Sequence, residues 1–136
     1  MLLAGQEIRV VARKGNAEDI QSILHGWYRQ QAHGVFIERL NIIAQRADWT
    51  RHRSIPLKLR KMKRSWGNCS ASGVIKLNTH LVKAPLVIID SVIAHELCHL
   101  REMNHGKSFY ELLQSLNPNW QRDRLRLRAD GNTYLL

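Results

Sequence analysis

A His-Glu-x-x-His motif inside an apolar segment constrains the fold of this chain more than any other feature. The motif is His95-Glu96-Leu97-Cys98-His99, and the apolar segment runs over residues 85–109. Residues four apart on an α-helix lie about 40° apart in projection and about 6 Å along the axis, so both histidines can hold one metal ion. Glu96 lies about 100° around the helix, where it can contact a metal-activated water without binding the metal itself.

The residues around the motif predict a helix that is buried on one face. Apolar residues recur there at three- and four-residue steps from Leu86 to Leu100. The alternative is a buried helix that holds two histidines by chance. We favour a zinc site, because three polar side chains in an apolar setting cost free energy unless something satisfies them, and a zinc ion would do so.

Length and composition indicate a cytoplasmic domain. The 136 residues suffice for one core, so we expect a single domain over residues 1–136. No apolar run approaches the ~20 residues needed to cross a bilayer, and the start lacks the features of a signal peptide, so we expect no membrane partner. Two cysteines, Cys69 and Cys98, make no disulfide framework, which favours a reducing compartment.

The net charge of +10 predicts attraction to anions such as nucleic acid and nucleotides. Part of the excess lies in residues 51–64, which contain no acidic residue. Its candidate nucleic-acid contacts are Arg51, Arg53, Lys58, Arg60, Lys61, Lys63 and Arg64. Four arginines form a second cluster within residues 122–128, and we expect them to point outward. The alternative for both clusters is a solvated basic face.

Hydrophobic periodicity predicts a mixture of helices and strands. We expect a short strand within residues 7–13 and one long helix from about residue 16 to residue 47. Alternating residues predict strands at 56–62 and 74–78, which we expect to form an antiparallel hairpin with a structured loop between them. After the motif helix we expect a short helix, and then one or two helical turns around residues 120–127.

A third metal ligand is expected shortly after the motif, because catalytic zinc sites usually have three protein ligands. Asn104 and Gly106 are residue types that end helices, and a turn there would bring His105 back towards the motif. The spacing is also that of the metzincin motif, although Glu102 stands where that motif has a glycine. We favour His105 over Glu111, which is the second choice.

Together these segments resemble the YgjP-like metallopeptidase family, which is related to the SprT-like and WLM proteases. The resemblance implies an α+β, compact zincin-like domain in which a small mixed or antiparallel sheet packs on a long N-terminal helix and the central motif helix. It also implies one Zn²⁺ ion held by His95, His99 and His105, with Glu96 catalytic. The matching segments are Met62–Ser70, Ile75–Asn78, Ala84–Pro85, Ile89–Asp90, His95–Leu100 and Asn104–Phe109.

The predicted reaction is zinc-dependent hydrolysis of a peptide bond in a peptide or protein substrate. Glu96 would act as general base towards a zinc-activated water. Tyr110 or Arg101 would stabilise the oxyanion, and the sequence does not distinguish them. If the strand near residues 74–78 lies at the sheet edge, it would bind an extended peptide through Val74, Ile75, Lys76, Leu77 and Asn78.

Two other classes of function remain open. The same metal site in a basic cleft could hydrolyse nucleotide phosphoanhydrides. Alternatively, the chain is a basic binding module in which zinc is structural, and the stretch 51–64 would also suit a protease that acts on nucleic acid. A Glu96→Gln variant separates an enzyme from a binding module, and parallel assays of peptides and nucleoside triphosphates separate the two enzymes.

Overall fold

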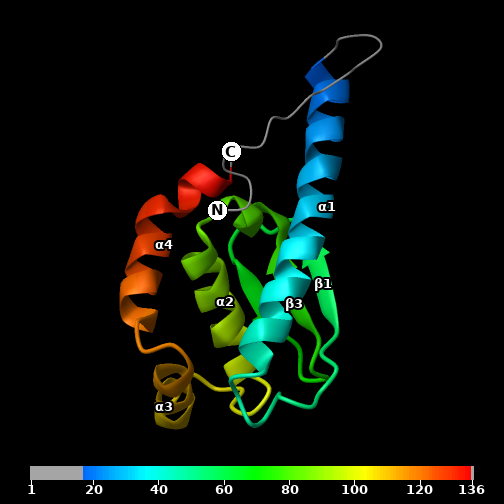
Figure 1. Cartoon of the computed structure of the whole chain (residues 1–136). Coiled ribbons are helices and arrows are strands. Elements are labelled where there is room, and N and C mark those ends of the chain that lie inside the picture. Colours follow the sequence, from blue (N-terminus) through cyan, green and yellow to red (C-terminus); the bar gives the residue numbers. More distant parts are fainter. Residues whose placement is uncertain (1–16, 136) are drawn as a thin grey trace.

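The computed structural model describes residues 17–135, which form four α-helices, one 3₁₀ helix and a three-stranded sheet (Figure 1). The predicted α+β fold class is confirmed, whereas the strand expected within residues 7–13 lies outside the described residues. The elements in chain order are α1 (Ala17–Ala44), β1 (Leu57–Arg60), β2 (Gly67–Cys69), β3 (Ile75–Asn78), η1 (Thr79–Lys83), α2 (Leu86–Cys98), α3 (Lys107–Leu116) and α4 (Trp120–Tyr134).

The sheet is mixed, and β3 is its central strand. β1 pairs with β3 in parallel, and β2 pairs with β3 in the antiparallel direction. The predicted antiparallel hairpin is therefore wrong, because residues 67–69, expected to be loop, form the strand that occupies the antiparallel position. The prediction of an edge strand at residues 74–78 is also wrong, since β3 has a neighbour on each side. The strand of this sheet that lies beside α2 is β2.

The long helix α1 braces the fold, as the sequence predicts. It crosses in front of the sheet and packs on α2, η1 and β1 (Figure 1). Arg39 of α1 donates two hydrogen bonds of 2.8 Å to the carboxylate of Asp90 in α2. The apolar side chains that α1 buries recur at four- and three-residue steps and include Ala32, Phe36, Leu40 and Ile43.

Helix α2 is the apolar centre of the molecule. Ile88, Ile93 and Leu97 are completely buried in it. In Figure 1, α1 lies on one side of α2 and α4 on the other. Among the described residues, none of the helices is both long enough and apolar enough to cross a membrane.

The C-terminal helices cover the other side of α2. In α3, Phe109 and Leu113 are buried, which fixes the inner face of this amphipathic helix. α4 extends over Trp120–Tyr134 and is longer than the one or two turns expected from the sequence. Most of its residues are polar or charged, but the exposed face carries an i,i+4 ion pair between Arg126 and Asp130, which favours helix over loop.

Candidate metal centre and cleft

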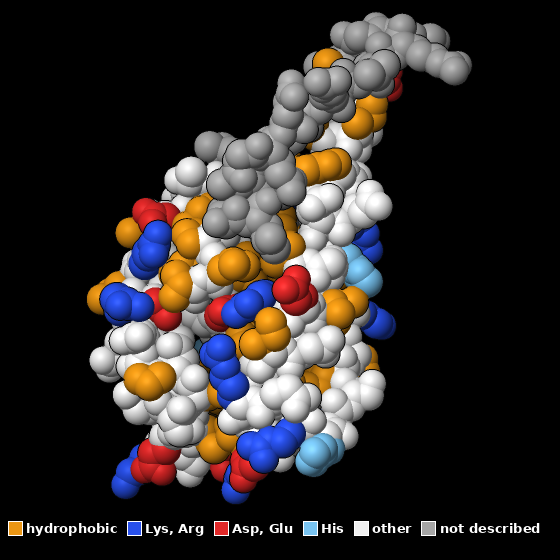
Figure 2. Space-filling model, viewed as in Figure 1, with side chains coloured by type: hydrophobic (Ala, Val, Ile, Leu, Met, Phe, Trp, Pro, Cys, Tyr) orange, Lys and Arg blue, Asp and Glu red, His pale blue; other side chains and the backbone are white. Residues whose placement is uncertain are grey.

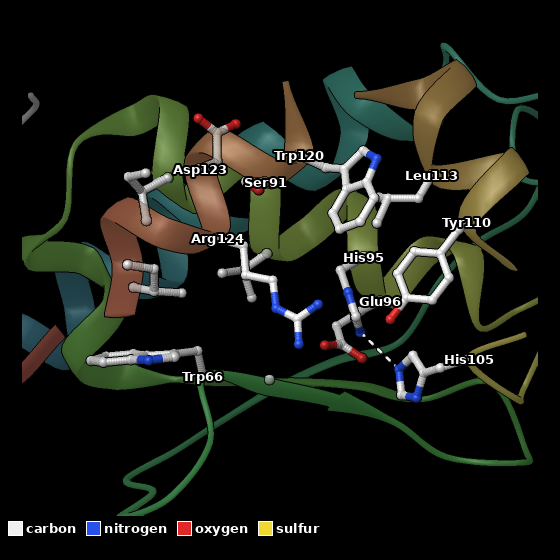
Figure 3. Close-up of a pocket in the computed structure, with 14 residues that line it drawn as sticks. Trp66, Ser91, His95, Glu96, His105, Tyr110, Leu113, Trp120, Asp123 and Arg124 are labelled. Atoms are coloured by element: carbon white, nitrogen blue, oxygen red, sulfur yellow. Dashed lines mark hydrogen bonds between the residues drawn. The ribbon is translucent and has the colours of Figure 1, made fainter. Parts of the chain in front are cut away.

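Three imidazoles converge at the C-terminal end of α2. His95 and His99 lie one turn apart on the helix, and His105 comes from the loop that leads into α3. The ligating nitrogens of the three side chains all lie within 4.8 Å of one another. The Nε2 atoms of His95 and His105 are 3.1 Å apart (Figure 3). The turn after α2 therefore brings His105 back to the motif, as expected, although the helix ends at Cys98 and not at Asn104 or Gly106.

The geometry of this cluster fits a metal ion. Two ring nitrogens 3.1 Å apart repel each other unless a proton or a cation lies between them. In a tetrahedral zinc site with Zn–N bonds of 2.0–2.1 Å, the ligating nitrogens are about 3.3 Å apart. In addition, Nδ1 of His99 donates a hydrogen bond to the carbonyl oxygen of Glu102, 3.0 Å away. A bond of this kind fixes the tautomer that leaves Nε2 free for a metal.

The surroundings of the cluster favour the neutral form of His95 and His99. Burial, and to a smaller extent the neighbouring His99 and His105, lower the pKa of His95 to about 4. The neutral ring is the form that binds a metal. Phe109 is fully buried beneath the cluster, with ring centroids 4.6 to 4.9 Å from those of all three histidines. Phe109 therefore supports the cluster from the side of the core.

Glu96 lies beside the cluster and is 6% exposed. Burial raises the pKa of its carboxyl group to about 7, because a charged carboxylate is poorly stabilised away from water. Strand β2 approaches it closely at Gly67, where a Cβ atom would lie 3.2 Å from Cγ of Glu96 and 3.1 Å from Cδ2 of Leu77. A glycine at this position lets the strand lie directly against the carboxyl group.

A cavity of about 400 Å³ opens in front of His95, Glu96 and His105. Its floor is formed by β2 and the residue before it, and its opposite wall by α4 (Figure 3). Three aromatic side chains line the cavity: Trp66, Tyr110 and Trp120. A cavity of this size, mostly apolar and with a few polar groups at one end, is typical of a site for a small molecule or a peptide side chain.

Of the two residues expected to stabilise an oxyanion, only Tyr110 lies in the cavity. Its ring is 6.4 Å from that of His105, and Figure 3 shows its hydroxyl group pointing towards His105 and Glu96. Arg101 instead lies over the ring of Trp49, 6.0 Å from its centroid, and 3.9 Å from Asp48. It does not line the cavity.

Glu111, the second choice for a metal ligand, is outside the cluster. It is exposed on α3 and lies 3.8 Å from Lys107 in an i,i+4 ion pair. It therefore contributes neither to the three-imidazole group nor to the wall of the cavity.

The basic residues of the stretch 51–64 are all exposed, and none of them lines the cavity in front of the imidazoles. Within the described part of the chain, none of the seven forms an ion pair. Lys58 and Arg60 alternate along β1 with the half-buried Leu57 and Leu59, as expected for a half-exposed strand. On the face shown in Figure 2, by contrast, Lys and Arg side chains are interspersed with acidic ones.

The residues that line the cavity include several that the sequence did not mark as site residues, among them Trp66, Trp120 and Arg124. The arginines of residues 122–128 are all exposed, as expected, but Arg124 also lines the cavity, which was not expected. The spacing of residues could have indicated those on α4. Trp120, Arg124 and Leu127 follow four- and three-residue steps and therefore share one face of the helix. That face is the one turned towards the cavity (Figure 3).

The fold is shared with two solved structures of metallopeptidase zymogens. Abylysin of Pyrococcus abyssi has a TM-score of 0.62 and 19% sequence identity, over 69% of this chain and 92% of the other. Jannalysin of Methanocaldococcus jannaschii has a TM-score of 0.59 and 21% identity, over 69% of this chain and 94% of the other. This chain therefore has the fold of these two structures, and it carries three histidines that could hold a metal ion.

Residues 2–130 match the model of the YgjP-like metallopeptidase domain, and the chain belongs to this family of hydrolases. Membership implies a metal ion, for which the three-histidine cluster is the matching donor set. A curated relative, the UTP pyrophosphatase of Escherichia coli (strain K12), is 32% identical over 56 residues, or 41% of this chain. The match spans about a third (34%) of the length of that relative.

Proposed function

We propose that this protein is a zinc metallopeptidase in which one Zn²⁺ ion is held by His95, His99 and His105. The observation that carries the proposal is the convergence of three imidazoles beside a buried carboxyl group at one end of an open cavity. Zinc, when bound, would supply a Lewis acid that lowers the pKa of water and polarises the substrate carbonyl group.

The side chains around the metal centre have distinct roles in this proposal. The Glu102 carbonyl orients His99 through the hydrogen bond to Nδ1. The Glu96 carboxylate accepts the proton of the attacking water and later passes it to the leaving amine. Tyr110 donates a hydrogen bond from its hydroxyl group to the developing oxyanion, for which its position in the cavity is suitable.

Strand β2, rather than β3, would bind the backbone of an extended peptide. Among the strands of residues 17–135 it pairs only with β3, and an unpaired strand edge can bind a peptide by main-chain hydrogen bonds. Gly67 at its start touches Glu96. A peptide added along this edge would therefore pass directly in front of the proposed general base.

Replacement of Glu96 by Gln tests the proposal. The variant should bind zinc as the parent protein does, since Glu96 is not among the three converging ligands, and should lose turnover of peptides by about 100-fold or more. Glu111→Gln is the matched control, because Glu111 is exposed and outside the cavity. Retention of peptide hydrolysis by the Glu96→Gln variant would show that the role of Glu96 is wrong.

Hydrolysis of nucleotide phosphoanhydrides is the second candidate function. It is favoured by the similarity to a UTP pyrophosphatase, which is limited to 56 residues. Purified, zinc-loaded protein should be assayed in parallel with UTP and with a mixture of short peptides. Release of pyrophosphate without any new amine would favour this function over the first, and new amines alone would exclude it.

A nucleic-acid contact through the stretch 51–64 would suit a protease whose substrates are bound to DNA or RNA. The support is the exposure of all seven basic residues and their lack of ion pairs among the described residues. The contact predicts an affinity that falls steeply between about 50 and 200 mM salt. An affinity that does not change with salt would exclude it.

We also propose that the protein acts in the cytoplasm as a single domain. Cys69 and Cys98 are both unpaired thiols in the fold, as expected in a reducing compartment. The helices and the sheet of residues 17–135 share one cluster of buried apolar side chains, which supports one folding unit. Limited proteolysis that left a stable fragment smaller than this range would contradict the single domain.

A further inference from the structure

We infer that Arg124 binds an anionic group of the substrate, a carboxylate or a phosphate, and so selects substrates that carry negative charge beside the bond to be cleaved. The inference rests on the proposed function, because it concerns the same cavity, and it names the substrate class that the cavity accepts. It differs from the expectation that the arginines of α4 form a solvated outer face.

Arg124 lies on the inner face of α4. Trp120, Arg124 and Leu127 all line the cavity that contains His95 and Glu96. Figure 3 shows the guanidinium group pointing into this cavity, in the space between Trp66 and Glu96. A substrate group that reached the guanidinium would therefore lie in the same cavity as the proposed general base.

The charge of Arg124 has no counterion among the described residues, where no carboxylate oxygen lies within 4.0 Å of it. The neighbouring Asp123 also lines the cavity, but its carboxylate is 3.5 Å from Arg122 and accepts a hydrogen bond of 3.2 Å from Asn117. Arg124 is exposed to solvent at the cavity, so an anion that enters the cavity can reach it and serve as its counterion. The planar guanidinium fork matches carboxylate and phosphate groups in particular.

The packing of α4 holds Arg124 in place. Near the start of the helix, Nε1 of Trp120 donates a hydrogen bond of 2.8 Å to Oε1 of Gln114, and its ring lies 5.0 Å from that of Tyr110. Two turns after Arg124, Gly131 is so close to Trp66 that a Cβ atom would lie 3.1 Å from the indole ring. The helix is therefore anchored on both sides of Arg124, which fixes the point on α4 from which its side chain reaches the cavity.

The other arginines of α4 do not share this arrangement. Arg122 lies beside Asp123, Arg126 is 3.8 Å from Asp130 in an exposed pair, and neither lines the cavity. Arg126 therefore provides a matched control on the same helix. The anionic group could be the terminal carboxylate of a short peptide or a phosphate of a nucleotide, and these two sources require separate probes.

The test is a titration of the zinc-loaded protein with succinate and, separately, with inorganic phosphate. Binding would be followed by calorimetry and by tryptophan fluorescence, since Trp66 and Trp120 line the cavity. At least one probe should bind, and Arg124→Gln should weaken its binding about tenfold or more, whereas Arg126→Gln should change it less than about twofold. Preference for succinate would indicate a peptide carboxylate, and preference for phosphate a phosphorylated substrate.

Two results would overturn the inference. One is an affinity for both probes that is equal in the parent protein and in the Arg124→Gln variant. The other is the absence of binding of either probe at millimolar concentration to the zinc-loaded parent protein. Zinc content is measured for every sample, so that loss of metal is not mistaken for loss of the anion. If Arg124→Gln weakens binding but no peptide is cleaved, the proposed peptidase function fails and the anion site stands.

Discussion

Nδ1 of His99 and the carbonyl oxygen of Glu102 lie 3.0 Å apart. Because a carbonyl group can only accept, Nδ1 carries the proton, and Nε2 is the nitrogen available to a metal ion. Glu102 belongs to the segment between α2 and His105. The same turn therefore orients the second imidazole and supplies the third, so all three histidines of the candidate metal centre come from one continuous segment of the chain.

The first prediction concerns His105, which is exposed. Replacement of His105 by Ala should lower zinc affinity by at least ~100-fold. Loss of a residue that only hydrogen-bonds to a metal ligand already lowers metal affinity about 10- to 100-fold. The metal-free protein should keep its stability within about 0.5 kcal/mol, as is usual for a surface residue. His33→Ala, an exposed change on α1, is the control. Competition with a chelator measures the affinity, and unchanged affinity in the His105 variant would contradict the three-histidine site.

The second prediction concerns pH and the metal-free protein. The pKa of Glu96 is raised by burial from 4.5 to about 7, so the folded chain holds this proton more tightly than the unfolded chain does. The resulting stability is fully present below about pH 4.5 and is lost as the pH rises to about 7. The low pKa of His95 acts in the opposite direction, but it is common to the parent and to a Glu96→Gln variant.

The Glu96→Gln variant lacks this titration. Its stability relative to the parent protein should therefore increase by about 2–3 kcal/mol between about pH 4.5 and about pH 7.5. Urea unfolding with EDTA present, at several pH values across this range, measures the difference. A difference that stays constant with pH would mean that the carboxyl group titrates normally.

The third prediction concerns the close contact at Gly67. In a Gly67→Ala variant the new methyl group would meet Glu96, Leu77 and the carbonyl oxygen of Lys76 at 3.1 to 3.2 Å. We expect a loss of about 1–3 kcal/mol of stability, as in other overpacked sites, together with reduced turnover because Glu96 is displaced.

Gly34→Ala in α1 is the control for that change, because nothing lies within 4 Å of its Cβ position. It should stabilise the protein by about 0.5–1 kcal/mol through its helix propensity. Both variants can be compared by urea unfolding. Equal stability of the two variants would show that β2 is not in contact with α2 as described.

The fourth prediction compares two ion pairs. Arg39 and Asp90 are 20% and 23% exposed and join α1 to α2 through two short hydrogen bonds. Arg39→Ala should cost about 1–3 kcal/mol, because it leaves a partly buried carboxylate without its partner. Arg126→Ala removes an exposed pair with a 3.8 Å separation and should cost less than about 0.5 kcal/mol. Thermal unfolding of both variants measures the two losses of stability. A larger loss in Arg126→Ala than in Arg39→Ala would contradict the prediction.

The parts of the fold that depend on local signals could be predicted from the sequence. The long helix α1 and the motif helix α2 follow from apolar residues at helical spacing. The two helices are decided within one or two turns of the chain, where periodicity and end signals are informative. The return of His105 towards the motif was predicted, but its reason was wrong, because α2 ends at Cys98, well before Asn104, and Gly106 precedes α3 with a negative φ.

The parts that depend on distant contacts could not be predicted. β2 has only three residues, Gly67–Cys69, in a segment rich in turn formers, and it becomes a strand because it pairs with β3. Likewise, Arg101 and Arg124 look equally available in the sequence. Tertiary packing places the first over Trp49 and the second in the cavity.

The division of the site between two segments has an evolutionary consequence. The converging imidazoles and Glu96 all lie within residues 95–105, whereas the facing wall is formed by α4. Substitutions on the inner face of that one helix can alter which molecules are accepted while the reactive groups are inherited unchanged. Members of the family can thus diverge in specificity and still retain a common chemistry.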